Sequence, residues 1–285
     1  GTNGGLAGNY TFTGGTQTVT IGTAALAVVT ASDASKTYGT TYTLGTTAFT
    51  VTGLQGSDNI SGVTLTSAGA INTANAGTYA IVPSDAVFSV GSPGNYTISY
   101  VNGTLTVNPA PLTAAVTGTP TRVYNGTTVA TLAPANYALT GFVSGEGATV
   151  TQTAGTYNSK DVVTATTVSA TLAPTDFTAT GATLLSNYTL PTAASGAGQI
   201  TAYAVSMTGV RAYDSTTSVA AGIFTLNPLV GTETLTLSGT GSVSSANAGT
   251  YTVALGTLSL GTLALGDGTN GGLAGNYTFT GGTQT

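Results

Sequence analysis

Apolar and polar residues alternate along several short stretches of the chain. The alternation is clearest in residues 16–21, 48–52, 104–107 and 233–238. A period of two places every second side chain on the same face, as in a β-strand that is buried on one side. No stretch combines the i, i+3, i+4 spacing of a helix with capping residues. The pattern therefore predicts an all-β protein, and the many Thr and Val residues, which are stiff at χ1, favour the same class.

Pairs of residues that tolerate a positive φ separate some of the predicted strands. Asn102-Gly103 divides the alternating residues 96–107, and Gly14-Gly15 divides residues 10–21. A two-residue Asn-Gly loop is typical of a type I′ β-hairpin. We therefore expect a hairpin at both places and a longer one within residues 188–201.

The segment 1–18 returns without a substitution as the segment 268–285, so equivalent positions differ in number by 268 − 1 = 267. Self-similarity at a fixed period is the mark of a tandem architecture. We therefore expect the chain to be a segment of a longer polypeptide that repeats this sequence in tandem. Residues 1–24 would then supply the closing strands of a preceding module.

Three sets of landmarks recur in the same order within one period. Each set has a basic residue two positions before a tyrosine, then an Ala-Gly-Thr-Tyr block, then an Asn-Tyr-Thr block. The position numbers of the first tyrosines, Tyr38, Tyr124 and Tyr213, differ by 124 − 38 = 86 and 213 − 124 = 89. The order predicts three copies of one small fold, which we call the first, second and third modules. They span residues 25–108, residues 109–202 and residues 203–285, the last truncated in its final strand.

The junctions between the modules are short. Pro109 and Pro111 restrict the backbone of the first junction, so the last strand of one module should run almost directly into the next and give a rod. A module of this size can hold its own small β-sandwich or β-grasp-like core, whereas the coils of a β-solenoid repeat at about 20–30 residues. Discrete modules are therefore the preferred expectation, and a continuous β-solenoid is the alternative.

The composition excludes several classes of function. Charged residues make up 5% of the chain, the net charge is −5, and there is no Cys or His. The usual ligands of zinc, copper and iron and the commonest catalytic base are therefore missing. Four scattered cations give no footprint for nucleic acid, and no apolar run reaches the ~18 residues of a membrane helix. We expect no enzyme activity, no cofactor, no nucleic-acid partner and no membrane insertion in this segment.

The few charges recur at equivalent positions. Each module has a cation followed by an acid, and the position numbers differ by 58 − 36 = 22, 146 − 122 = 24 and 233 − 211 = 22. The pairs are Lys36 with Asp58, Arg122 with Glu146, and Arg211 with Glu233. We predict that each pair forms a structural ion pair that specifies register, because an exposed pair contributes only about 0–1 kcal/mol to stability.

Tyrosines also recur at equivalent positions. The repeated residues are Tyr38, Tyr79, Tyr96, Tyr124, Tyr157, Tyr188, Tyr213, Tyr251 and Tyr277. Tyrosines at fixed places in a small β-fold are typically core anchors or tyrosine corners, which is the role we expect. A surface that stacks on carbohydrate is the alternative.

Two further residue groups have simple explanations. The remaining acids do not show the Asp-x-Asp-x-Asp spacing of a calcium loop, so we expect no specific calcium site. They include Asp33, Asp85, Asp176, Asp214 and Asp267. Seven asparagines begin Asn-x-Ser/Thr sequons, which a Thr-rich β-protein contains as ordinary turn and strand residues, and glycosylation stays open. They are Asn9, Asn59, Asn95, Asn102, Asn125, Asn187 and Asn276.

The ordered motifs resemble those of two domain families. Lys-x-Tyr-Gly, Ala-Gly-Thr-Tyr, Asn-Tyr-Thr and Gly-Thr-Leu-Thr-Val, as they follow one another in residues 36–107, resemble the MBG domain of the YGX type. Residues 122–201 and 211–285 are similar to its sister, the YDG domain, although Asn125 and Ser215 depart from the naming motif. The resemblance implies a repeat segment of a large secreted bacterial adhesin, similar to the filamentous-haemagglutinin-like proteins.

We therefore expect a structural segment of an extracellular or cell-surface bacterial protein. It would act as a stalk or fibre in cell attachment or in a biofilm matrix. Its partners would be adjacent repeats of the same polypeptide, with lateral self-association of chains left open. The alternative is a module that binds extracellular glycans or a host protein. An enzyme that acts on polysaccharide is disfavoured, because no pair of carboxylates recurs.

Overall fold

The computed structural model describes residue 14, residues 18–253 and residues 258–279. Their regular structure consists of β-strands and short 3₁₀ helices, so the predicted all-β class is confirmed. The strands form several small sheets, consistent with sandwich-like modules and not with one continuous solenoid. The chain divides into two compact units, Gly1–Pro109 and Ala110–Thr285, which we call unit 1 and unit 2.

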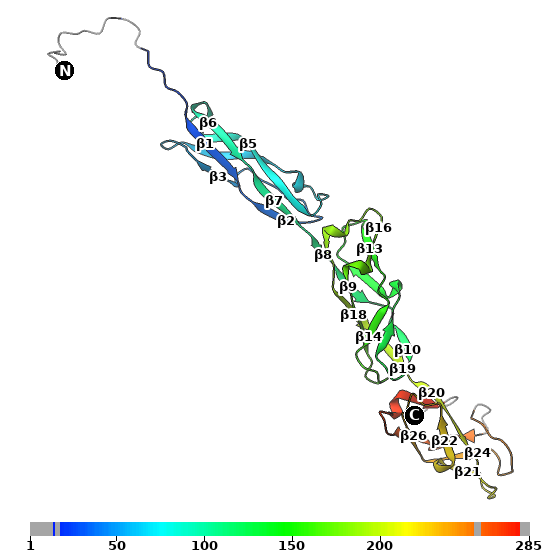
Figure 1. Ribbon diagram of the computed structural model, residues 1–285. Helices are drawn as coiled ribbons and strands as arrows, with labels where there is room; N and C mark the ends of the chain where they lie inside the picture. Colours follow the sequence, from blue (N-terminus) through cyan, green and yellow to red (C-terminus); the bar gives the residue numbers. More distant parts are fainter. Residues whose placement is uncertain (1–13, 15–17, 254–257, 280–285) are drawn as a thin grey trace. The chain divides into compact units, whose positions relative to one another are not determined.

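Unit 1 contains two sheets with the orders β3-β1-β6 and β2-β7-β5-β4 (Figure 1). The strands are β1 (Ala24–Ala31), β2 (Ala34–Thr37), β3 (Phe49–Thr52), β4 (Asn59–Thr66), β5 (Gly77–Val90), β6 (Tyr96–Val101) and β7 (Gly103–Asn108). Two 3₁₀ helices, η2 (Ala68–Ala70) and η3 (Pro93–Asn95), lie between them. Alternate residues of β1 and β7, including Val29 and Leu105, are fully buried, as the period-two pattern requires.

Unit 2 begins with the strands of the second module. They are β8 (Ala110–Pro111), β9 (Thr113–Val116), β10 (Thr121–Val123), β11 (Val129–Thr131), β12 (Tyr137–Thr140), β13 (Gly147–Val150), β14 (Ala154–Tyr157), β15 (Thr167–Thr171), β16 (Phe177–Thr180), β17 (Tyr188–Thr189), β18 (Ala193–Ala197) and β19 (Gln199–Thr201). The largest sheet has the order β11-β14-β15-β18-β9-β12. The 3₁₀ helices are η4 (Pro134–Asn136), η5 (Pro174–Asp176) and η6 (Leu185–Asn187).

The third module completes unit 2. Its strands are β20 (Tyr203–Gly209), β21 (Ser218–Ala220), β22 (Phe224–Asn227), β23 (Leu235–Ser238), β24 (Thr240–Val243), β25 (Leu258–Ser259), β26 (Ala264–Asp267) and β27 (Tyr277–Phe279). The 3₁₀ helices are η7 (Ala221–Ile223) and η8 (Ala274–Asn276). The sheets have the orders β22-β20-β27, β21-β24-β25 and β23-β26.

No described strand of the second module pairs with a strand of the third, yet the two modules share one hydrophobic core. Every described strand pair of unit 2 lies either within residues 110–201 or within residues 203–279. In contrast, buried side chains from both stretches, among them Ile200, Val205 and Tyr277, belong to a single hydrophobic cluster. Packing of apolar side chains therefore makes unit 2 one compact body, although no backbone ladder crosses residue 202 among the described strands.

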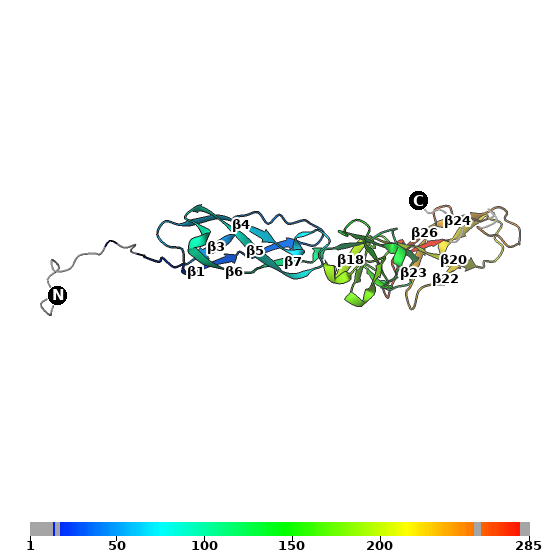
Figure 2. The same cartoon turned by 90° about the horizontal axis from the view of Figure 1, so that it is seen from above.

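The predicted hairpins are wrong where the structure describes them. β6 pairs in parallel with β1, whereas β7 pairs with β2 and β5, so the two strands beside Asn102 lie in different sheets (Figure 2). Between residues 188 and 201, β17, β18 and β19 likewise pair with other strands and not with one another. The expected hairpin of residues 10–21 lies largely outside the described residues.

Two parallel strands change sheets together in unit 1. β1 runs beside β6 in the first sheet, and their continuations β2 and β7 run side by side in the second. At the crossing, the Thr104 N–H donates to Asp33 Oδ1 at 2.7 Å. A Cβ on Gly103 would lie 2.6 Å from the Ala31 carbonyl oxygen, so only glycine permits this close approach. The glycine that predicted a turn therefore serves a crossover.

Three of the four predicted strands are present, as β3, β7 and β23. Residues 18–21 form no strand, and Val19 and Ile21 are 84% and 92% exposed. Residues 16 and 17 lie outside the described residues. No described strand pairs with residues 18–21, and without a neighbour an alternating segment has nothing against which to bury its apolar face.

The substitution Gly103→Ala should destabilise unit 1 by about 1–3 kcal/mol, because the added methyl group collides with backbone oxygens that cannot rotate away. Urea unfolding followed by circular dichroism measures the change in the free energy of unfolding. Gly94→Ala is the matched control, since the nearest atom to its Cβ is Ser92 Oγ at 3.9 Å. Equal effects of the two substitutions would contradict the crowding at Gly103.

Candidate functional site at the junction of the second and third modules

Each module places a tyrosine hydroxyl against a carboxylate. The hydroxyl donates to an acid on a turn 38 to 44 residues earlier in the chain. The pairs are Tyr96 to Asp58 at 2.6 Å, Tyr188 to Glu146 at 2.5 Å, and Tyr277 to Glu233 at 2.5 Å. In every case the same hydroxyl accepts the backbone N–H three residues before the acid. Those donors are Gln55 at 3.0 Å, Val143 at 3.0 Å and Val230 at 3.1 Å.

Local backbone geometry explains why this arrangement recurs. Each of these tyrosines directly follows a 3₁₀ helix, η3, η6 or η8, and enters a strand in extended conformation. Each acid closes a tight turn, because its N–H donates to the carbonyl oxygen three residues earlier. The helix end and the hydrogen-bonded turn have the same backbone geometry in each module, so the hydroxyl and the carboxylate meet in the same way.

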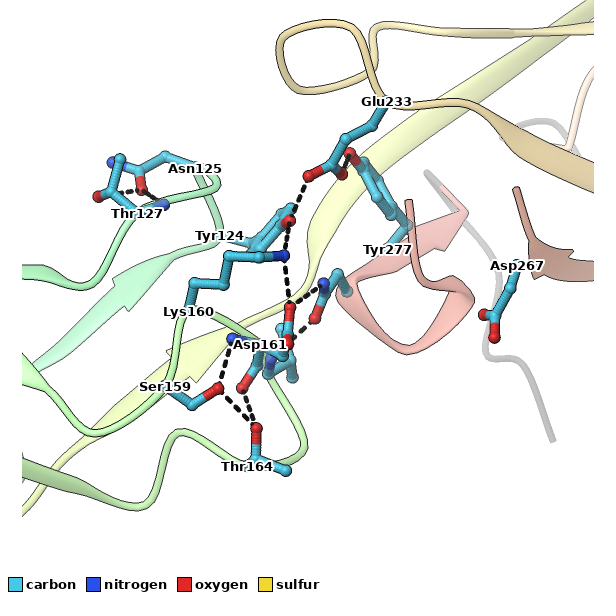
Figure 3. Close-up of polar contacts among 12 residues, drawn as sticks. Tyr124, Asn125, Thr127, Ser159, Lys160, Asp161, Thr164, Glu233, Asp267 and Tyr277 are labelled. Carbon is cyan, nitrogen blue, oxygen red and sulfur yellow. Dashed lines mark hydrogen bonds and ion pairs between the residues drawn. The ribbon is translucent and has the colours of Figure 1, made fainter. Parts of the chain in front are cut away.

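In unit 2 the carboxylate of Glu233 accepts a second tyrosine. Tyr124 of the second module donates to Oε1 at 2.6 Å, while Tyr277 of the third module donates to Oε2 at 2.5 Å (Figure 3). The two rings meet edge to face, with centroids 5.5 Å apart and an interplanar angle of 72°. Tyr124 is 1% exposed and Tyr277 is 4% exposed. The half-buried carboxylate of Glu233 therefore joins two modules through hydrogen bonds from two buried tyrosines, and hydrogen bonds to a carboxylate are stronger than neutral ones.

A second set of polar contacts lies beside the tyrosines. Asn276, which is 1% exposed, donates its amide N–H to Asp161 Oδ1 at 2.8 Å and accepts the Val162 N–H at 2.8 Å. Lys160 Nζ lies 2.9 Å from Asp161 Oδ1 and 3.4 Å from the Tyr124 hydroxyl oxygen (Figure 3). Both ends of the Asn276 amide are therefore used across the junction, as a buried polar group requires.

The protonation states follow from these surroundings. Burial, and then the hydrogen bond to Glu233, raises the pKa of Tyr124 and of Tyr277 above the ordinary value for tyrosine. The hydrogen bond to Asp161 raises the pKa of Lys160. Burial alone would raise the pKa of Asp161, but hydrogen bonds from Lys160 and Asn276 outweigh it and lower that pKa. At neutral pH the tyrosines are thus neutral donors, and Lys160 and Asp161 form a charged pair.

Small residues allow the modules to approach closely. A Cβ on Gly126, where φ is 77°, would lie 3.1 Å from Cγ1 of Val230. A Cβ on Gly275 would lie 3.3 Å from Cγ2 of Val163. Each contact joins a residue of the second module to one of the third. Val230 packs against the shared hydrophobic cluster, whereas Val163 is 76% exposed.

The three ion pairs expected from the sequence are corrected by the structure. Lys36 Nζ donates to the carbonyl oxygens of Thr40, at 2.8 Å, and Ile71. Arg122 donates to the carbonyl oxygen of Thr127 and lies over the ring of Tyr157, 5.5 Å from its centroid.

Arg211 pairs with Asp214 three residues along and not with Glu233. Asp58, Glu146 and Glu233 instead accept the tyrosine hydroxyls described above. In unit 2 the reason is geometric: Glu233 meets the tyrosine of the preceding module, 109 residues away, and not the cation of its own module. The constant sequence spacing between the cation and the acid does not show whether the acid contacts the cation of its own module or a tyrosine of another module.

The repeated tyrosines differ in exposure. Six are buried, namely Tyr38, Tyr96, Tyr124, Tyr157, Tyr188 and Tyr277. Tyr79 and Tyr251 are half-buried, and each donates to the carbonyl oxygen four residues earlier, at 2.9 and 2.8 Å. Tyr157 instead lies at the end of β14 and donates to the Pro120 carbonyl oxygen at 3.0 Å, so the expected equivalence of Tyr157 with Tyr79 and Tyr251 is wrong. Tyr213 is 70% exposed, so the expected core role is wrong for this tyrosine. The junction also uses Lys160, Asp161 and Asn276, which the repeat pattern does not single out.

Within the described ranges, no three His, Cys, Asp or Glu residues lie together in a way that could hold a metal ion. No helix in this part of the chain is long and apolar enough to cross a membrane. Two of the scattered acids serve local contacts. Asp214 binds Arg211, which lowers its pKa to about 2, and Asp267 accepts the Ala274 N–H at 2.8 Å.

The substitution Tyr124→Phe should lower the free energy of unfolding of unit 2 by about 1.5–3 kcal/mol, because it removes the hydrogen bond between a buried hydroxyl and a carboxylate. Urea unfolding measures the effect. Tyr251→Phe is the matched control: its hydroxyl donates to a neutral carbonyl oxygen at an exposed place, so its loss should cost about 1 kcal/mol or less. A Tyr124→Phe variant as stable as this control would contradict the role of the carboxylate.

Unit 2 should lose stability as the pH rises above about 10, the unfolded-state pKa of tyrosine. The folded-state pKa values of Tyr124 and Tyr277 are higher than that value. Their stabilisation is therefore fully present below about pH 10 and is lost as the pH rises through the folded values. Urea midpoints between about pH 8 and about pH 11 test this, and the double variant Tyr124→Phe/Tyr277→Phe should show a weaker decline over the same range.

Comparison with protein families agrees with the repeated motifs. Residues 27–106 match the MBG domain (YGX type), and residues 108–196 match the YDG domain. A search of curated proteins and a search of solved structures gave no match. The chain therefore carries an MBG domain of the YGX type and a YDG domain in tandem.

Proposed function

We propose that this chain is a structural repeat segment of a secreted bacterial adhesin or surface filament, in which it forms part of a stalk or fibre. The observation that carries the proposal is the buried junction around Glu233. A carboxylate held by one tyrosine from each of two modules restricts the angle between them. Such a restriction suits a protein whose modules transmit tension or hold a tip away from a surface.

The chemistry of the chain supports the same function. The junction uses hydroxyl, amide and carboxylate groups, and the sequence contains no cysteine. Its contacts therefore do not depend on the redox state of thiols. The letter-for-letter return of the segment 1–18 as the segment 268–285 further supports a molecule in which many such modules follow one another.

A localisation experiment tests the proposal. Antibodies raised against residues 18–253 should label intact cells of the organism that makes the protein, and protease treatment of those cells should remove the label. The physical reason is that an extracellular stalk lies outside the envelope, where antibodies and proteases have access. Labelling only after the cells are permeabilised would contradict the proposal, and an antibody against a cytosolic protein controls for lysis.

A further inference from the structure

The third module exposes the same loop that the second module buries in the junction. In both loops the arginine donates to the carbonyl oxygen five residues along. In both, an Asn or Asp side chain accepts the N–H and hydroxyl of the threonine two residues along. The tyrosine that lies between the arginine and the Asn or Asp is Tyr124 in the loop of the second module and Tyr213 in the loop of the third. Tyr124 is 1% exposed, whereas Tyr213 is 70% exposed.

The surroundings of Tyr213 also repeat those of Tyr124. A hollow of ≈ 560 Å³ adjoins Tyr213 and is lined by Asn247 and Ala248, both of which are exposed. β24 pairs with β21 in the register in which β14 pairs with β11. Asn247 follows the first residue of β24 by 247 − 240 = 7 positions, and Asp161 follows the first residue of β14 by the same 161 − 154 = 7. Asn247 and the Ala248 N–H thus correspond to Asp161 and the Val162 N–H, which hold Asn276 in the buried junction.

The first module exposes the complementary half of such a junction. Its Asp58 and Tyr96 form the same hydrogen bond as Glu233 and Tyr277. Asn95 precedes Tyr96 as Asn276 precedes Tyr277, at the end of a 3₁₀ helix in both cases. Asn95 is nevertheless exposed, whereas Asn276 is 1% exposed.

Two positions distinguish these exposed faces from the buried junction, and a polar residue stands at both of them. Gly126 approaches Val230 within the junction. Ser215 takes the place of Gly126 in the third module, and Gln55 takes the place of Val230 in the first, where its N–H bonds to the tyrosine in the same way. A polar pair, Ser215 with Gln55, thus stands where the buried junction has an apolar contact. The two faces therefore match each other in chemistry.

We propose that the Tyr213 face of the third module binds the Asp58 face of the first module of a second copy of this chain. The Tyr213 hydroxyl donates to the Asp58 carboxylate, and Asn95 bonds to Asn247 and to the Ala248 N–H. Because the two faces differ, the contact joins copies head to tail and can continue indefinitely. The inference rests on the repetitive character of the proposed function and not on its extracellular location.

Cross-linking within a joined chain tests the contact. The segment 268–285 repeats the segment 1–18, so two copies can share it and form one continuous chain without a foreign linker. The test pair is Gly249→Cys in the first copy and Gly94→Cys in the second, the positions that correspond to Val163 and Gly275. The chain has no cysteine of its own, so each variant contains only the two introduced thiols.

Two further pairs serve as controls. Val163→Cys with Gly275→Cys tests the junction that the structure contains, where a Cβ on Gly275 lies 3.3 Å from Val163. Gly249→Cys with Thr64→Cys in the second copy reports random encounter at an exposed strand position. The measurement is the rate of disulfide formation under mild oxidation, followed by peptide mass spectrometry. Disulfides form only where the Cα atoms come within about 7 Å.

The test pair should close at a rate within about tenfold of the internal pair, and Tyr213→Phe or Asp58→Asn should slow it several-fold, because each substitution weakens the proposed hydrogen bond. A rate no higher than that of the Thr64 pair would overturn the proposal. Failure of the internal pair would overturn the junction geometry from which the proposal is drawn. Neither result bears on surface labelling of cells, so the two proposals can fail separately.

Discussion

The carboxylate of Glu233 is the constraint on which the organisation of unit 2 depends. This carboxylate is half-buried and accepts one hydroxyl from each module. If either tyrosine is missing, the carboxylate loses one of the two hydrogen bonds that connect the modules. Both tyrosines belong to one cluster of apolar side chains that extends across residue 202, and the low local dielectric around their hydroxyls strengthens these bonds.

The same pairing of a tyrosine and an acid within each module gives the contact its modular character. Tyr96, Tyr188 and Tyr277 orient the acids of their own modules without a contact from a neighbouring module. The end of a 3₁₀ helix positions each tyrosine, and a tight turn positions each acid. A preformed carboxylate loses little conformational entropy when a second tyrosine binds. This preorganisation explains how a chain with 5% charged residues can make specific contacts between modules.

Glycine and asparagine serve close approach and junction contacts in this fold. Gly103 lets two strands change sheets against the backbone of Ala31, and Gly126 lets the second module approach Val230 of the third. The amide of Asn276 belongs to a sequon, yet it is buried and bonded on both sides. Gly103, which resembles a turn residue, and Asn276, which resembles a glycosylation site, are thus required for packing between strands and for contacts between modules.

The sequence by itself determined the all-β class, three of the four predicted strands, the repeated acids, and the tyrosines of the Asn-Tyr-Thr blocks that bind them, because these depend on local periodicity and on spacing. Tertiary structure alone decided which partner each of them takes. The Asn-Gly pair became a crossover because β6 and β7 find separate neighbours, and Glu233 binds Tyr124 across 109 residues instead of Arg211. A repeat fixes the order of residues within a module. It does not state which face of one module meets the next, since that depends on shape and burial in three dimensions.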